Sequence, residues 1–190
     1  YSAAGGEAYV LALDDTGPVA AQHPLLVTDV DYAYVDLVAG PGLGWFVRGG
    51  RTGGTIRGRY LGPDGVPIAP SLIAPEPTRV APSEGRWLLA TVTSGATELR
   101  WIDGRTRSVG STVATLPRPD SATKTSLTHA SGGFLWAEGR TAGMRVSRVR
   151  ADGTLLDSTP QVLSSHSVRT QVAAAVGNLV FVVWSDARSG

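Results

Sequence analysis

The stretch that decides the fold is residues 144–190, which read MRVSRVRADGTLLDSTPQVLSSHSVRTQVAAAVGNLVFVVWSDARSG. The pair Asp152-Gly153 lies between two apolar runs, and a Gly after Asp supplies the positive φ values that tight hairpin turns need. A second turn is expected at Gly177-Asn178. Because Val and Leu dominate the apolar positions and Val favours strands, the segment predicts four short strands, at about 144–151, 154–163, 170–176 and 179–184.

A Trp-x-acid-x-Arg motif in this segment has a counterpart 48 residues earlier in the chain. The two copies are Trp184, Asp186, Arg188 and Trp136, Glu138, Arg140. Steps of 45 residues back from Trp136 reach Thr91, Phe46 and Tyr1. The aromatic residue is replaced by Thr91 in one repeat, so the pattern is imperfect.

The Asp-Gly pair is a second marker that recurs at a similar interval. It stands at 64–65, 103–104 and 152–153, and a looser version, Asp15-Thr16-Gly17, follows the first apolar run. Self-similarity at a fixed period of about 20–50 residues is the sequence signature of repeat architectures. Two independent markers therefore indicate a repeat whose period averages about 46 residues.

The repeat predicts an all-β chain folded as a β-propeller of four-stranded antiparallel blades. We expect a single array over residues 1–190, with repeats at about 8–54, 55–98, 99–143 and 144–190. A solenoid usually has one or two strands in about 20–30 residues, which fits less well, and a β-sandwich would not explain the period. No window shows clean helical periodicity, so almost no helix is expected.

Four repeats leave two arrangements open, a closed four-bladed ring or an arc of a larger propeller. Tyr1 aligns with the last strand of a blade, and only Tyr1–Glu7 would be left to close a ring. The first residue is not Met and the chain stops just after a strand, which favours the arc. An arc exposes the apolar faces of its terminal blades, so its partner would be the remainder of the propeller or a second copy of the chain.

The runs Arg150–Asp157 and Leu179–Arg188 resemble the secreted propeller-like repeats that are abundant in GC-rich myxobacteria. The resemblance implies a propeller fold and a location outside the cell or on the exterior of its envelope. Most of those proteins have no assigned activity, so no functional residues carry over from them. The same runs do not match the WD40 pattern of Gly-His and Trp-Asp dipeptides.

The composition narrows the range of partners. The net charge of +1 is too small for a nucleic-acid-binding protein, which needs a clustered basic face. The longest apolar run, Val172–Trp184, is too short to span a bilayer. There is no Cys, which removes disulfides, thiolate metal sites and Cys nucleophiles. We therefore expect neither nucleic acid nor a membrane span.

Two sets of charged residues are candidate sites. Arg51, Arg140 and Arg188 could form a ring of loop cations that binds anionic sugars or carboxylates. The favoured alternative is an ion pair inside each blade beside a packed Trp. Asp29, Asp31 and Asp36 could bind Ca²⁺, but EF-hand spacing is absent and a solvated turn is favoured. No other cofactor is expected.

Signals of catalysis are weak. His23, His129 and His166 lie at different repeat positions, so a propeller would not gather them. There is no Gly-x-Ser-x-Gly elbow, and the Asp-Gly pairs lack the intervening residue of a sialidase Asp-box. The expected function is a non-enzymatic extracellular module that binds a protein or glycan, or a structural part of a larger assembly. The alternative is a carbohydrate-active hydrolase or lyase that uses loop carboxylates.

Overall fold

The computed structural model describes residues 8–10, 13–14, 17–18, 25–28, 34–40, 44–50, 55–62, 66–75, 78–117 and 124–187. Every regular element in these ranges is a β-strand, which confirms the expectation of an all-β chain almost without helix. The strands are β1 Ala8–Val10, β2 Leu13–Asp14, β3 Gly17–Pro18, β4 Leu25–Thr28, β5 Tyr34–Gly40, β6 Gly44–Gly50, β7 Thr55–Leu61, β8 Pro67–Pro75, β9 Thr78–Ser83, β10 Arg86–Val92, β11 Ala96–Asp103, β12 Val109–Pro117, β13 Lys124–Ala130, β14 Gly133–Arg140, β15 Gly143–Arg150, β16 Gln161–Ser164, β17 Val168–Val176 and β18 Leu179–Asp186.

Three complete antiparallel sheets form the centre of the chain. They consist of β5–β8, β9–β12 and β13–β16, and in each sheet the strands lie side by side in chain order. Each strand pairs with the next one along the chain, as expected for an up-and-down meander. The remaining strands form two-stranded sheets, β17 with β18, β1 with β4, and β2 with β3.

The sheets do not begin where the repeats were predicted to begin. β15 and β16 pair with β14 and each other, whereas β17 and β18 form a separate sheet. The prediction that the four strands of residues 144–190 make one sheet is therefore wrong. The predicted boundaries at 54/55, 98/99 and 143/144 fall within sheets, at or just after the hairpin between the second and third strands. A sequence period gives the spacing of equivalent turns, but it does not show which strand starts a sheet.

Apolar clusters hold the sheets face to face. Phe46 and Tyr60 of the β5–β8 sheet pack with Trp87 of β10, while the adjacent residue Leu88 packs with Trp136 of β14. Successive side chains of a strand point to opposite faces, so β10 is covered by a neighbouring sheet on each side. A third cluster joins the β13–β16 sheet to β17 and β18 through Ala137, Met144, Val146, Val168, Val182 and Trp184.

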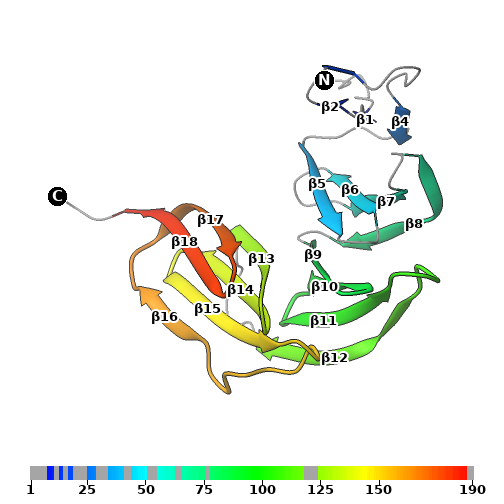
Figure 1. Cartoon of the computed structure of the whole chain (residues 1–190). Coiled ribbons are helices and arrows are strands. Elements are labelled where there is room, and N and C mark those ends of the chain that lie inside the picture. Colours follow the sequence, from blue (N-terminus) through cyan, green and yellow to red (C-terminus); the bar gives the residue numbers. More distant parts are fainter. Residues whose placement is uncertain are drawn as a thin grey trace.

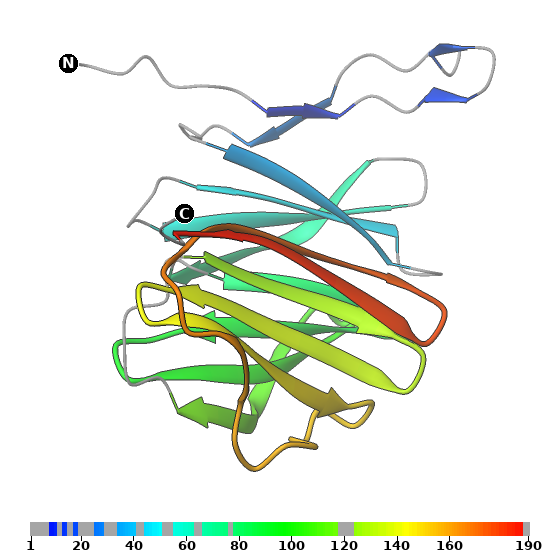
Figure 2. The ribbon, with the colours of Figure 1, turned by 90° about the vertical axis from the view of Figure 1, so that its left-hand side faces the viewer.

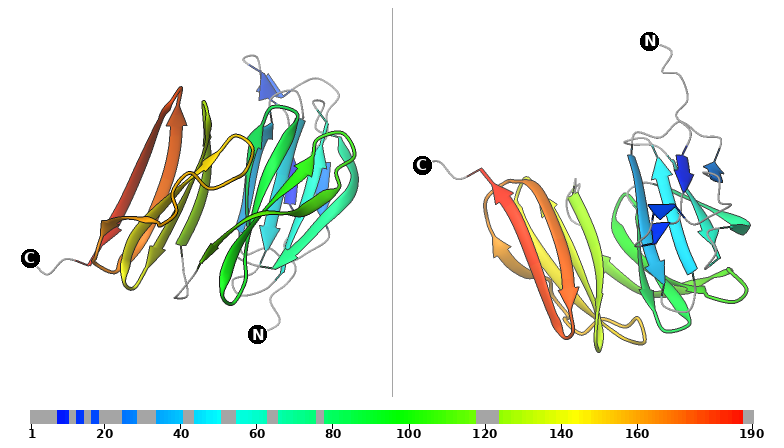
Figure 3. Two further views of the ribbon diagram at one scale, coloured as in Figure 1. Left: turned by 90° about the horizontal axis from the view of Figure 1, so that it is seen from below. Right: turned by 45° about the horizontal axis from the view of Figure 1, so that its top comes forward.

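The sheets follow one another along an arc (Figure 1), which Figure 2 views from the side of β17 and β18. The first strands are its inner elements, because β5 contacts β9, β9 contacts β13, and β13 contacts β17. In Figure 3 the sheets are seen stacked in sequence from β5 to β18. Among the described strands, β17 and β18 pair only with each other. The described strands as a whole therefore form an open arc and no closed ring.

The predicted turns are confirmed where the structure describes them. Gly153 lies between β15 and β16 with φ of 92°, and Gly177 lies between β17 and β18 with φ of 60°. Asp152 Oδ1 accepts hydrogen bonds from Thr154 N at 2.8 Å and Thr154 Oγ1 at 2.6 Å, and these bonds lower the pKa of Asp152. Asp64-Gly65 lies outside the described residues.

The motif predicts that Trp136 and Trp184 are largely buried and occupy equivalent places in successive blades. The burial is confirmed for Trp136, but the equivalence is wrong. Ala130 pairs with Gly133 across one turn as Val176 pairs with Leu179 across the next, so equivalent residues lie 46 apart. Trp184 then takes the place of Glu138, and Trp136 is only 1% exposed while Trp184 is half-buried. The error of two residues keeps a side chain on the same face of a strand, which is why the motif appeared consistent.

Candidate functional site: the hollow between the first strands

The first strands β5, β9, β13 and β17 together line a hollow of about 630 Å³. Each of them is an edge strand that pairs with only one neighbour in its sheet. Two kinds of side chain face the hollow. Apolar residues such as Ala39 and Ala175 line it together with polar ones, and the polar lining residues are Arg79, Thr125, Ser126, Thr128, His129 and Gln171.

Hydrogen bonds beside the hollow tie β9 to β13 and β13 to β17. Arg79 Nε donates to Thr125 O at 2.8 Å, and Thr128 Oγ1 donates to Ala173 O at 3.2 Å. Ser126 Oγ donates to Gln171 Oε1 at 3.0 Å. The partners are 46, 45 and 45 residues apart, about one repeat period. Hydrogen bonds between these first strands therefore recur at about the repeat period.

His129 adds an imidazole to the lining. Its ring lies 4.9 Å from that of Phe134, centroid to centroid, and burial lowers the pKa of His129 below its usual value. The imidazole is accordingly neutral near pH 7. Among the described lining residues the hollow thus presents hydroxyl, amide, imidazole and guanidinium groups. Sequence reasoning treated His129 as incidental and missed the other polar lining residues.

The predicted Arg set is only partly within the described residues. Arg51 and Arg188 lie outside them. Arg140 belongs to β14 and is 1% exposed, and its guanidinium forms an ion pair with the buried carboxylate of Glu138 on the same face of the strand. The structure thus places Arg140 between two sheets, in the in-blade ion pair that was the alternative interpretation, and not in a surface ring of cations.

The predicted Ca²⁺ ligands stay untested. Asp29 and Asp31 lie outside the described residues. Asp36 lies in β5, where its backbone pairs with that of Arg48. Within the ranges that the structure describes, no group of three or more His, Asp or Glu side chains is arranged to hold a metal ion, and no helix is long and apolar enough to cross a membrane.

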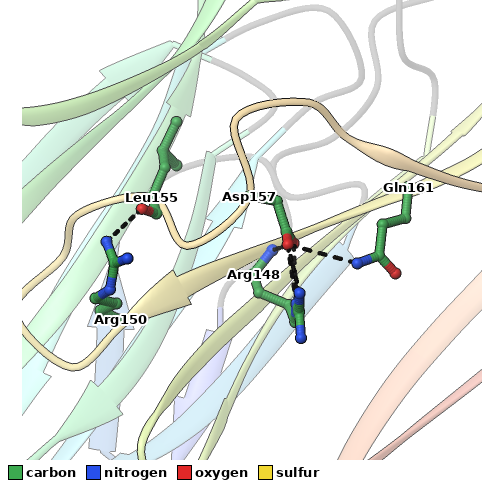
Figure 4. A network of polar contacts seen from close by, with 5 residues as sticks. All are labelled: Arg148, Arg150, Leu155, Asp157 and Gln161. Carbon is green, nitrogen blue, oxygen red and sulfur yellow. Dashed lines mark hydrogen bonds and ion pairs between the residues drawn. The ribbon is translucent and has the colours of Figure 1, made fainter.

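A second, apolar cleft of about 410 Å³ lies between the β13–β16 sheet and β18. Leu135, Val146 and Leu163 line one side, and Val180 and Val182 line the other. Arg148 at its margin is held by Asp157, with 2.6 Å between Arg148 Nη2 and Asp157 Oδ1 (Figure 4). This contact lowers the pKa of Asp157 and raises that of Arg148. The polar network fixes the long connection between β15 and β16.

Comparison of the chain with protein-family models, with curated proteins and with solved structures finds no match.

Proposed function

We propose that the chain is a non-enzymatic module of the β-propeller type that binds a polar ligand in the hollow between its first strands. The observation that supports it is the convergence of four edge strands on one hollow with a polar lining. Propeller blades are four-stranded sheets around a central channel. Three four-stranded meanders, packed face to face with their first strands innermost, have the arrangement that such a blade array requires.

The chemistry of the lining favours an acidic glycan as the ligand. Ser126 and Thr128 bring hydroxyl groups, Gln171 brings an amide and Arg79 brings a permanent positive charge. Sugars offer hydroxyl groups to such partners, and Arg attracts carboxylates. The predicted location outside the cell rests on the resemblance to secreted repeats, and it would give the module access to glycans.

A carbohydrate-active hydrolase or lyase is the alternative. Glycoside cleavage generally uses two carboxyl groups roughly 5–10 Å apart across the scissile bond. The groups that line the hollow are instead hydrogen-bonding groups and a cation. This composition favours binding over cleavage.

The experiment is a screen of the purified chain against an array of neutral and uronic-acid glycans, followed by calorimetry with each hit. Ala39→Trp should fill the hollow, because Ala39 is an exposed lining residue. The matched control is Ala142→Trp, at an exposed Ala in the β14–β15 turn. We expect Kd to rise at least tenfold in A39W only. Absence of any glycan hit, equal affinity of A39W and wild type, or cleavage of the bound glycan would contradict the proposal.

A further inference from the structure

The hairpin of β17 and β18 is the first half of a sheet. Its residues pair as those of β13 and β14 do, with every pair from Val176↔Leu179 to Thr170↔Ser185 displaced by 46 residues. In the complete sheet, β14 also pairs along its other edge with β15. The corresponding edge of β18 has no partner among the described strands. An edge of this kind presents a row of backbone donors and acceptors that is ready to pair with another strand.

The same hairpin carries an apolar face that nothing in the described structure covers. Five large side chains on it are 58–72% exposed, namely Val172, Val176, Leu179, Phe181 and Val183. The register places Val172 opposite Val183 and Val176 opposite Leu179, so these residues share one face. Val180 and Val182, on the opposite face of β18, line the apolar cleft. A contiguous exposed apolar patch marks an interaction site, so both the edge and the face call for a partner.

Strands β1 and β4 are the second half of a sheet. They pair at Ala8↔Thr28, Tyr9↔Leu26 and Val10↔Leu25, with a bulge after the first pair. The third and fourth strands β15 and β16 pair at Met144↔Ser164, Arg145↔Val162 and Val146↔Gln161, with a bulge at the same step. Every partner is displaced by 136 residues, about three repeat periods, and the same displacement aligns Gly17 with Gly153 and Pro24 with Pro160.

We propose that β18 of one copy of the chain pairs with β1 of a second copy, so that β17 and β18 together with β1 and β4 make a four-stranded sheet. The register of β14 with β15 predicts which residues then face each other. The pair Ala137↔Val146 corresponds to Val183↔Val10, and the pair Glu138↔Arg145 corresponds to Trp184↔Tyr9. The inference depends on strand pairing alone and is independent of any ligand in the hollow.

The position of β1 and β4 favours a second copy over the chain's own strands. They lie beside the β5–β8 sheet (Figures 1 and 2), at the opposite end of the arc from β18 (Figure 1). A second copy can reach β18 with its β1 and β4 left in that place, whereas pairing within one copy would require the arc to close. Two copies joined head to tail at both ends would form a ring of eight sheets, within the known range of about 4–8 propeller blades.

Disulfide trapping tests the proposal, because the chain has no Cys of its own. Val10→Cys and Val183→Cys are made in separate chains that carry tags of different size, mixed and oxidised. A disulfide needs Cα atoms about 4.4–6.8 Å apart and side chains on one face, so we expect a mixed dimer on a non-reducing gel. The control mixture of Val10→Cys with Val182→Cys should give at least fivefold less of the mixed dimer, because Val182 points to the opposite face of β18.

Two further measurements make the result decisive. Light scattering on the wild-type chain should give twice the monomer mass of 19.7 kDa. A doubly substituted Val10→Cys/Val183→Cys chain shows whether the link forms within one molecule. A mixed dimer of the separate chains supports the proposal. Three results would overturn it. The first is a link found only inside single chains, and the second is no link in either preparation. The third is a wild-type monomer at about 100 µM, roughly the concentration at which a specific dimer should persist.

Discussion

Strands β14 and β18 hold equivalent places in neighbouring sheets, and they differ in what covers them. Seven of the eight residues of β14 are buried, whereas β18 alternates between exposed and half-buried residues. Both strands are rich in apolar residues, and β18 begins Leu-Val-Phe-Val-Val-Trp. A continuous apolar run is typical of a strand with both faces covered. The sequence of β18 is therefore suited to a strand with both faces covered, whereas the described strands of one chain cover only one of its faces.

The largest expected effect comes from truncating the aromatic residue in the covered strand. Trp136→Ala removes a side chain that is 1% exposed and packs with Leu88 and Phe134, and we expect a loss of about 3–5 kcal/mol in the free energy of unfolding. Trp184→Ala, in the half-covered strand, should cost less than half as much. Urea denaturation of both variants measures the two costs. Equal costs would mean that β18 is as well covered in solution as β14.

The buried ion pair of β14 gives the next effect. Glu138→Gln removes the carboxylate beside Arg140, where both side chains are at most 5% exposed, so a loss of about 3 kcal/mol is expected. The control is Glu98→Gln on β11, whose pair with Arg100 has the same spacing but side chains that are 30–40% exposed. That change should cost about 0–1 kcal/mol. Similar losses measured for the two variants by urea denaturation would refute a buried environment for Glu138.

Two turn glycines extend the comparison to the connections between strands. Both Gly153 and Gly177 have positive φ, which costs a residue with a Cβ about 1–2 kcal/mol. At Gly153 a Cβ would also meet Trp101 Nε1 of the adjacent sheet at 2.9 Å, whereas nothing lies within 4 Å at Gly177. We therefore expect Gly153→Ala to lower the melting temperature more than Gly177→Ala. The opposite order would show that the β15–β16 turn does not touch the neighbouring sheet.

The smallest effect concerns pH. The hydrogen bonds and charge of Arg148 hold the pKa of Asp157 in the folded protein below the value of this group in the unfolded chain. The ion pair therefore contributes to stability above the unfolded pKa of about 4, and this contribution is lost as the pH falls through the lower folded pKa. Asp157→Asn should lower the melting temperature slightly at pH 7, and the difference from wild type should shrink toward pH 3. A difference that stays constant over this range would exclude the ion pair as its cause.

The sequence predicts the strands and turns of this fold well, but it does not predict how they are grouped. Asp152-Gly153 and Gly177-Asn178 lie at turns because only a few residue pairs favour the backbone angles required there. The grouping of strands into sheets depends on which edge strands meet in space, and a period of about 46 residues is compatible with any starting strand. Each sheet predicted from the repeat therefore begins two strands away from the first strand of an observed sheet.

The candidate site was missed because its residues are small and chemically ordinary. Arg140 was predicted as a binding residue because it belongs to a repeated motif, but it lies in the core. Thr128 and Ser126 are indistinguishable in sequence from surface strand residues. A signal did exist, since the partners of the three hydrogen bonds between first strands are 45 or 46 residues apart. Comparison of the first strands one period apart would have brought these residues together.

The two incomplete sheets have a consequence for the length of such proteins. In the dimer proposed above, the joint between two copies falls in the middle of a sheet, with β17 and β18 from one copy and β1 and β4 from the other. Insertion or loss of one whole period inside the chain would leave both ends unchanged and still complementary. The number of sheets could then change through duplication of a single gene segment, while the same joint continued to connect the ends.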